Sequence, residues 1–262
     1  MIDFIFVFLA GLITALATGL GAIPLFYTGT ISSRQKVVLW GVASGIMVAA
    51  SIFGLFREGW LEYSILPVFL GSLIGALLVF ISSHLLDHVS MNPTHLPNAD
   101  FKQLLLILGV LTVHSFPEGV AVGVSFSELG LDQGLAMLGT SIPWLAVTMT
   151  IAISIHNIPE GLAVSIPLRN LGVSRWSLVG WSVFTSLPQP VGAVLAFGLV
   201  QYAETMLPYG FGFAGGAMIY LVLTEFFPEA IDEGSSLPET ATPVLLGSFL
   251  LAGAAMTALL LL

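Results

Sequence analysis

Two nine-residue stretches, HSFPEGVAV at residues 114–122 and HNIPEGLAV at residues 156–164, share the pattern H-x-x-P-E-G-x-A-V. Each stretch lies within a long apolar segment, so each places an imidazole and a carboxylate where a membrane interior tolerates ionisable groups poorly. Ionisable side chains at that depth are functional candidates by default. Two matched pairs of histidine and glutamate therefore predict a divalent-metal site in the middle of a membrane protein.

The overall composition also indicates a membrane protein. Of the 262 residues, 56% are hydrophobic and only 8% are charged, whereas soluble domains carry roughly 25% charged residues. The apolar stretches are long enough to span a lipid bilayer as helices, so we expect an all-α polytopic membrane protein. The absence of cysteine excludes thiolate zinc sites and thiol catalysis. The net charge of −9 argues against nucleic acid as a partner.

The apolar segments predict eight transmembrane helices in a single transporter-sized domain, residues 1–262, because no polar segment is long enough to form a separate soluble domain. The predicted spans are 3–28, 35–57, 63–86, 102–126, 142–167, 175–201, 208–230 and 242–262.

The six basic residues predict the orientation of the chain in a cell membrane. Basic residues favour cytoplasmic loops, and only Arg57 falls on the opposite side from the others. Both termini are therefore expected on the extracytoplasmic side of a multi-pass protein. The residues on the predicted cytoplasmic side are Arg34, Lys36, Lys102, Arg169 and Arg175.

Four glutamates fall inside predicted spans, whereas no lysine or arginine clearly does. These glutamates are Glu118, Glu160, Glu225 and Glu229. A buried carboxylate must be paired, coordinated or protonated. With no basic side chain available, the compensating charge is expected to be a bound cation or protons.

The spacing within the motifs predicts how their side chains meet. Residues four apart share a helix face, so His114 lies over Glu118 and the second motif repeats this arrangement. Ser115 and Asn157 lie three residues before the two glutamates, on the adjacent face. Each glutamate could therefore bridge two subsites. The nitrogen-rich subsite would contain both histidines, and the oxygen-rich subsite would contain Ser115 and Asn157. Imidazole with carboxylate suits Zn²⁺, Fe²⁺, Co²⁺ or Mn²⁺, whereas Mg²⁺ and Ca²⁺ favour oxygen ligands alone.

The prolines and glycines of the motifs carry further expectations. Pro117 and Pro159 lack an N–H and are expected to kink their helices, and irregular helix geometry at membrane depth commonly lines a transport cavity. Gly119 and Gly123 have the spacing that lets another helix approach closely, and Gly161 and Ser165 have the same role in the second motif.

Residues outside the motifs leave alternatives open. Glu225 and Glu229 are either a second cation station on the exit path or a solvated helix end. Met47 offers a soft thioether ligand or simply packs. Three more histidines either collect metal weakly in a loop or belong to a solvated loop; they are His84, His88 and His95.

Three classes of function accommodate an intramembrane metal site. A transporter is favoured, because two matched halves suit alternating access. A zinc-dependent hydrolase in the membrane would activate a metal-bound water, but the chain lacks an H-E-x-x-H motif and an obvious separate base. A sensor or scaffold would need an output domain. We therefore expect a transporter and not an enzyme.

The two motifs resemble those of the Zrt/Irt-like (ZIP) family of divalent metal transporters, prokaryotic type, and the resemblance covers essentially the whole chain. Supporting stretches are ATGLG at 17–21, SGIM at 44–47 and EFFPEA at 225–230. The resemblance implies uptake of Zn²⁺, or of Cd²⁺, Fe²⁺, Mn²⁺ or Co²⁺, as a substrate and not as a cofactor. It also implies a 3+2+3 helix arrangement with an inverted repeat, elevator-like alternating access and a possible homodimer.

The resemblance also implies the metal ligands. A first site would use both motif histidines and both motif glutamates, with Met47 as a further candidate ligand. A second site would use Asn157 and the glutamates as bridges. Ser115 and Gln189 depart from the family pattern, because many relatives have Asn and Glu there. Glutamine keeps an oxygen donor but removes a negative charge. We therefore expect the second site to be weak, transient or empty.

Overall fold

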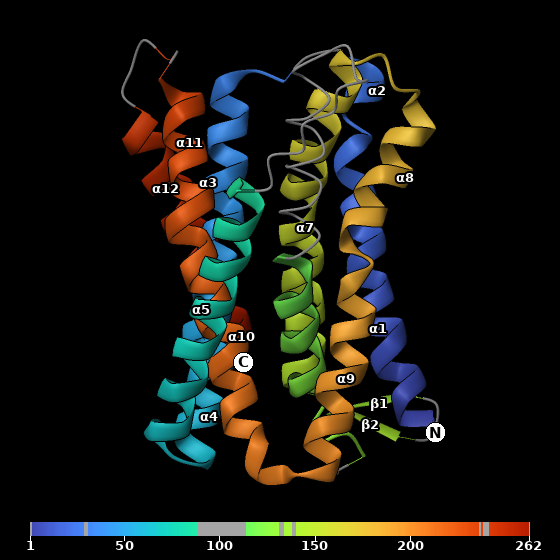
Figure 1. Ribbon diagram of the computed structural model, residues 1–262, viewed down its shortest axis with the longest axis vertical. Coiled ribbons are helices and arrows are strands. Elements are labelled where there is room, and N and C mark those ends of the chain that lie inside the picture. Colours follow the sequence, from blue (N-terminus) through green and yellow to red (C-terminus); the bar gives the residue numbers. More distant parts are fainter. Residues whose placement is uncertain are drawn as a thin grey trace.

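The chain in the computed structural model is almost entirely helical (Figure 1). The structure describes residues 2–28, 31–88, 114–130, 134–137, 140–235, 237 and 241–261. Within these residues, seven helices are long and apolar enough to cross a membrane. The predicted all-α polytopic fold is confirmed.

The seven observed spans agree closely with the predicted ones. They are Asp3–Tyr27, Ser33–Glu62, Ile65–Leu85, Trp144–Arg169, Arg175–Tyr202, Glu204–Gly234 and Ala241–Leu260. Of the remaining predicted span, 102–126, residues 114–125 are helical and residues 102–113 lie outside the described part of the chain. The largest difference at a single boundary is in the second span, whose helix continues five residues beyond the predicted end at Arg57.

Several spans are composed of consecutive helical elements. The first comprises α1 (Ile2–Thr18), a 3₁₀ turn (Gly19–Ala22) and α2 (Leu25–Thr28). The second and third comprise α3 (Ser33–Ala49), a π-helix (Ala50–Phe56), α4 (Arg57–Glu62) and α5 (Ile65–His88). The fifth and sixth comprise α7 (Trp144–Asn170), α8 (Arg175–Ser186) and α9 (Pro188–Tyr202). The last two comprise a 3₁₀ turn (Glu204–Met206), α10 (Leu207–Leu221), a π-helix (Val222–Phe226), α11 (Phe227–Gly234) and α12 (Ala241–Leu260).

A short β-hairpin precedes α7. Strands β1 (Gly134–Met137) and β2 (Thr140–Pro143) pair antiparallel, with Leu135 opposite Ile142. The sequence did not predict this hairpin, because strands of four residues are too short to show an alternating pattern.

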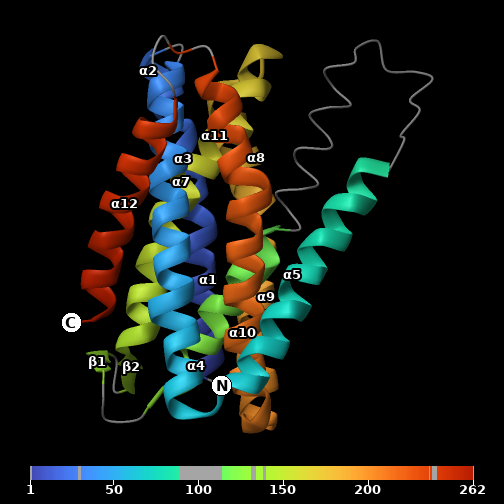
Figure 2. The same cartoon turned by 90° about the vertical axis from the view of Figure 1, so that its left-hand side faces the viewer.

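The helices form two groups, which Figure 1 shows side by side. The α7 group consists of α1, α7, α8, α9 and the helical residues 114–125. The α3 group consists of α3, α4, α5, α10, α11 and α12; in it α5 packs along α10, and α12 packs along α3 (Figure 2). Helices α3 and α7 contact each other across the boundary.

The motif glycines allow close packing within the α7 group. A Cβ atom at Gly119 would overlap the carbonyl oxygen of Gln189, and one at Gly123 would overlap that of Ala193. The backbone of residues 114–125 therefore lies directly against the backbone of α9. The predicted close approach of another helix at Gly119 and Gly123 is confirmed.

The motif prolines do not interrupt the described helices. α7 is one continuous α-helix that includes Pro159 and Pro167. A proline removes only its own N–H, so the hydrogen bonds on either side can hold the helix together. Continuity does not exclude a bend, so the kinks at Pro117 and Pro159 stay predictions. Irregular helix geometry is found among the described residues in two π-helices, Ala50–Phe56 and Val222–Phe226.

The ends of the helices place most described basic residues together. α3 and α8 begin, and α7 ends, at the end of the bundle that carries α2, whereas α4 and the β-hairpin lie at the opposite end, with the N-terminus (Figure 1). Arg57 begins α4.

α3 begins with a capping box, in which Ser32 Oγ accepts from the Gln35 backbone N–H and Gln35 Oε1 accepts from the Ser32 N–H at 3.0 Å.

Candidate metal site

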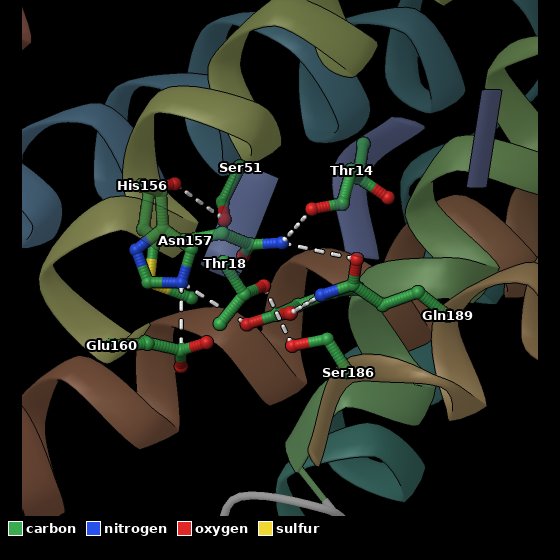
Figure 3. Close-up of polar contacts among 10 residues, drawn as sticks. Thr14, Thr18, Ser51, His156, Asn157, Glu160, Ser186 and Gln189 are labelled. Carbon is green, nitrogen blue, oxygen red and sulfur yellow. Dashed lines mark hydrogen bonds and ion pairs between the residues drawn. The ribbon is translucent and has the colours of Figure 1, made fainter. Parts of the chain in front are cut away.

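Three of the predicted site residues come together in the structure, and Figure 3 shows two of them, His156 and Glu160, facing each other. Glu118, His156 and Glu160 each offer a ligand atom within 4.8 Å of the other two. His156 Nε2 lies 3.1 Å from Glu118 Oε1 and 3.5 Å from Glu160 Oε1. The three residues are 1%, 1% and 3% exposed, in the order Glu118, His156 and Glu160. Two oxygens and one imidazole nitrogen at these separations form a partial coordination shell for a borderline divalent ion.

The site contains two carboxylates but no basic side chain within reach. In the described part of the chain, the ion-pair partners of Glu118 and Glu160 include no lysine or arginine. Glu160 Oε1 and His156 Nδ1 are buried without a hydrogen-bond partner there. Buried polar atoms are normally satisfied, so these atoms fit a site that holds a cation.

His114 lies beside this cluster and not within it. Its side chain is buried, and neither ring nitrogen has a hydrogen-bond partner among the described residues. His114, Glu118 and Met47 line one small, closely packed cavity between the two helix groups, with Pro117 from the first motif, and it has no room for a water molecule. The other lining residues are Val79, Ala217, Met218 and Leu221. Glu118 therefore lies between His156 and a second pair of candidate ligands, the His114 imidazole and the soft Met47 thioether.

The amides of Asn157 and Gln189 form a hydrogen-bonded chain that ends at Glu118, and Figure 3 shows the two amides facing each other. Gln189 Nε2 donates to Glu118 Oε2 at 2.5 Å. Asn157 Nδ2 donates to Gln189 Oε1 at 3.0 Å and to the backbone carbonyl of Thr14 at 2.7 Å. Ser115 is buried on the same helix as Glu118. Asn157, Gln189 and Glu118 of the predicted oxygen-rich subsite are thus brought together.

Some residues near the site were not predicted. Phe226 stacks on the His156 ring with centroids 5.4 Å apart, and it packs against Trp40 at 4.9 Å. Thr18 Oγ1 donates to Ser186 Oγ at 2.7 Å, which links α1 to α8. The sequence offered a signal for Phe226, because it follows Glu225 in a recognised stretch, but no signal for which neighbour it touches.

The structure places Glu225 and Glu229 in different surroundings. Glu225 is half-buried and accepts a hydrogen bond from Ser83 of α5 at 3.3 Å. Glu229 is exposed and lines a cavity between α3, α7 and α11. That cavity also contains Pro159, the residue before Glu160, and the ion pair of Lys36 Nζ with Glu233 Oε1 at 2.5 Å. A role of the two glutamates as a cation station on the exit path stays a prediction.

The remaining predicted histidines give little structural information. His84 is exposed on α5 and stacks on Phe80 with ring centroids 5.9 Å apart. His95 and the side chain of His88 lie outside the part of the chain that the structure describes. Their suggested role in collecting metal stays a prediction.

Sequence comparison finds relatives along most of the chain. The model of the family described as "ZIP Zinc transporter" matches residues 92–261. Zinc transporter GufA of Myxococcus xanthus is 31% identical over 93% of this chain and 94% of its own length. Zinc transporter ZIPB of Bordetella bronchiseptica is 34% identical over 90% of this chain and 75% of its own length. A putative zinc transporter of Arabidopsis thaliana is 40% identical over 84% of this chain, which spans only 34% of that longer protein.

Proposed function

The chain belongs to the ZIP zinc transporter family, and on that premise we propose that it carries a divalent transition-metal ion, Zn²⁺ first, across the cell membrane into the cytoplasm. The buried cluster of Glu118, His156 and Glu160 carries this proposal. Carboxylates inside a membrane need a compensating charge, and no lysine or arginine among the described residues pairs with Glu118 or Glu160. A transported cation supplies it transiently.

The proposed ligand set extends beyond that cluster. Met47 and His114 line the cavity next to Glu118, so a small movement between the helix groups would bring both to the metal. Neutral imidazole and thioether favour first-row and softer ions over Mg²⁺ or Ca²⁺. The matched relatives are named as zinc transporters, which favours transport over an intramembrane hydrolase.

The proposed mechanism is alternating access. The metal ligands belong to the α7 group, apart from Met47 in α3, and Phe226 of the α3 group covers one face of His156. Movement of the α7 group along the α3 group would uncover the site on one side and then on the other. The elevator-like form of this movement and a homodimer follow from the family and stay predictions.

The proposed exit is the cavity that contains Glu229. Its lining starts at Pro159, beside the site, and reaches the ends of α3 and α11. The basic residues at these helix ends support a cytoplasmic position for that side and an extracytoplasmic N-terminus, because basic residues favour cytoplasmic loops. A solvated carboxylate such as Glu229 would bind the departing ion weakly enough to release it.

Transport is tested with the purified full chain in liposomes that contain a zinc-sensitive dye. We expect Zn²⁺ entry that saturates with external Zn²⁺, because a finite number of sites must be loaded. Liposomes with the His156→Ala variant are the control, since this change removes the imidazole between both carboxylates. Entry that stays linear in Zn²⁺, or that is equal in the two preparations, would contradict the proposal.

Replacing Met47 with leucine tests whether the Met47 thioether is a metal ligand. We expect Cd²⁺ to compete with Zn²⁺ several-fold less well in the variant, because the thioether that lines the His114 cavity is lost. Leucine has nearly the same volume, so packing should be preserved. The measurement is inhibition of Zn²⁺ entry by increasing Cd²⁺. Unchanged competition would identify Met47 as a packing residue.

A further inference from the structure

The direction of the hydrogen bonds around Gln189 is fixed at both ends. A carboxylate only accepts hydrogen bonds, so Gln189 must turn Nε2 towards Glu118 Oε2. This orientation turns Gln189 Oε1 towards Asn157, which therefore donates through Nδ2. The same Nδ2 donates to the Thr14 backbone carbonyl, which also only accepts. The two amides thus present their N–H groups to the oxygens around them.

These N–H groups lie where the family resemblance expects a second metal ion, between Asn157, position 189 and Glu118. Glu118 uses its two oxygens differently, because Oε1 faces His156 and Oε2 faces Gln189. A hydrogen bond to a carboxylate is charge-assisted and supplies partial positive charge at that oxygen. The oxygen that would bridge to a second ion is therefore already satisfied by Gln189 at 2.5 Å.

The backbone keeps Gln189 in this position. Gln189 lies in the first turn of α9, directly after Pro188. A Cβ atom at Gly119 would lie 2.7 Å from Gln189 Cα, so the two backbones are in direct contact. Glu118 is the neighbour of Gly119, and its carboxylate thus meets the Gln189 amide at a separation that the helix packing sets.

We propose that Gln189 and Asn157 take the place of the second metal ion, so that the transport site holds one divalent ion per chain. This inference rests on the proposed function, because it concerns the same site. One divalent ion balances the two carboxylates of Glu118 and Glu160. A loaded site without net charge crosses the low-dielectric interior at lower cost than one with excess charge.

Gln189→Glu is the decisive variant. The change is nearly isosteric, but it replaces the N–H donor with a carboxylate that faces Glu118. The oxygen that replaces Nε2 then faces Glu118 Oε2 with no hydrogen between them, because Asn157 donates to the other oxygen of residue 189. A cation would relieve this repulsion, so the variant should gain a second metal ion. Gln189→Met is the matched control, because it removes the donor without adding charge.

The experiment measures bound Zn²⁺ per chain in the purified detergent-solubilised protein by equilibrium dialysis. We expect one tightly bound ion in the wild type, two in Gln189→Glu and no more than one in Gln189→Met. Two tightly bound ions in the wild type, or one in Gln189→Glu, would overturn the proposal. If Gln189→Glu does not fold, Asn157→Asp is the second variant. It adds a carboxylate at the other of the two hydrogen-bonded amides and should also gain a metal ion.

The same measurement separates this inference from the proposed function. Binding of one ion without Zn²⁺ entry into liposomes would leave the single-ion site standing and would refute transport. Saturable entry together with two bound ions in the wild type would support transport and would refute the role of Gln189. Metal content does not depend on turnover, so neither result can be mistaken for the other.

Discussion

Replacing Glu118 with alanine is expected to reduce Zn²⁺ entry into liposomes to the rate of protein-free liposomes. Glu118 is the residue that joins the parts of the site, because one oxygen lies 3.1 Å from His156 Nε2 and the other 2.5 Å from Gln189 Nε2. It also lines the cavity with His114 and Met47. Alanine removes a charge that a divalent ion needs and leaves the Gln189 donor unpaired in a buried position. Dye-loaded liposomes measure the effect directly.

Glu229→Gln is the control for this loss. It also removes a carboxylate from a membrane-spanning helix, but one that is exposed and lies in the proposed exit cavity. We expect saturable entry to remain, with a lower maximal rate, because the exit loses an attractive charge while the site keeps its ligands. Glu118→Ala with wild-type entry would refute the site. Glu229→Gln with no entry would show that the exit carboxylate is essential.

The motif spacing predicted which residues lie close together, but not how they bond. The pairing of His156 with Glu160 follows from their position four residues apart on one helix. The contact of Glu118 with His156 depends on two helices that lie side by side, and a repeated motif only suggests it. The part played by Thr14 could not be predicted, because its backbone carbonyl is the partner and every residue has one.

Glu225 and Glu229 show a second limit of reading a sequence by helix period. Their spacing of four places them on one face of a regular α-helix. Glu225 lies in the π-helix Val222–Phe226, whereas Glu229 lies in α11, so the regular α-helix that this rule assumes does not join the two residues. Hydropathy still located this span well, because total apolar length does not depend on the local helix type.

Replacing Gly161 with alanine is expected to lower the thermal midpoint of the solubilised protein by at least about 4 °C. A Cβ atom there would overlap the carbonyl oxygen of Thr18 and lie 2.8 Å from its carbonyl carbon. α1 cannot easily move aside, because Thr18 is hydrogen-bonded to Ser186 and the Thr14 carbonyl to Asn157. One added methyl group should therefore strain the contact between α1 and the helix that carries Glu160.

Gly180→Ala provides the matched control, because a Cβ atom at that helical position meets nothing within 4 Å. Alanine is favoured over glycine in a helix by about 0.5–1 kcal/mol, so this variant should be as stable as the wild type or slightly more stable. Both thermal midpoints can be measured as the temperature at which heating removes half of the monodisperse peak in size-exclusion chromatography. If both variants melt like the wild type, the backbones of α1 and α7 are not in contact. Since Gly161 directly follows Glu160, a selective effect at Gly161 would mean that the motif glycine holds the metal-binding helix against α1.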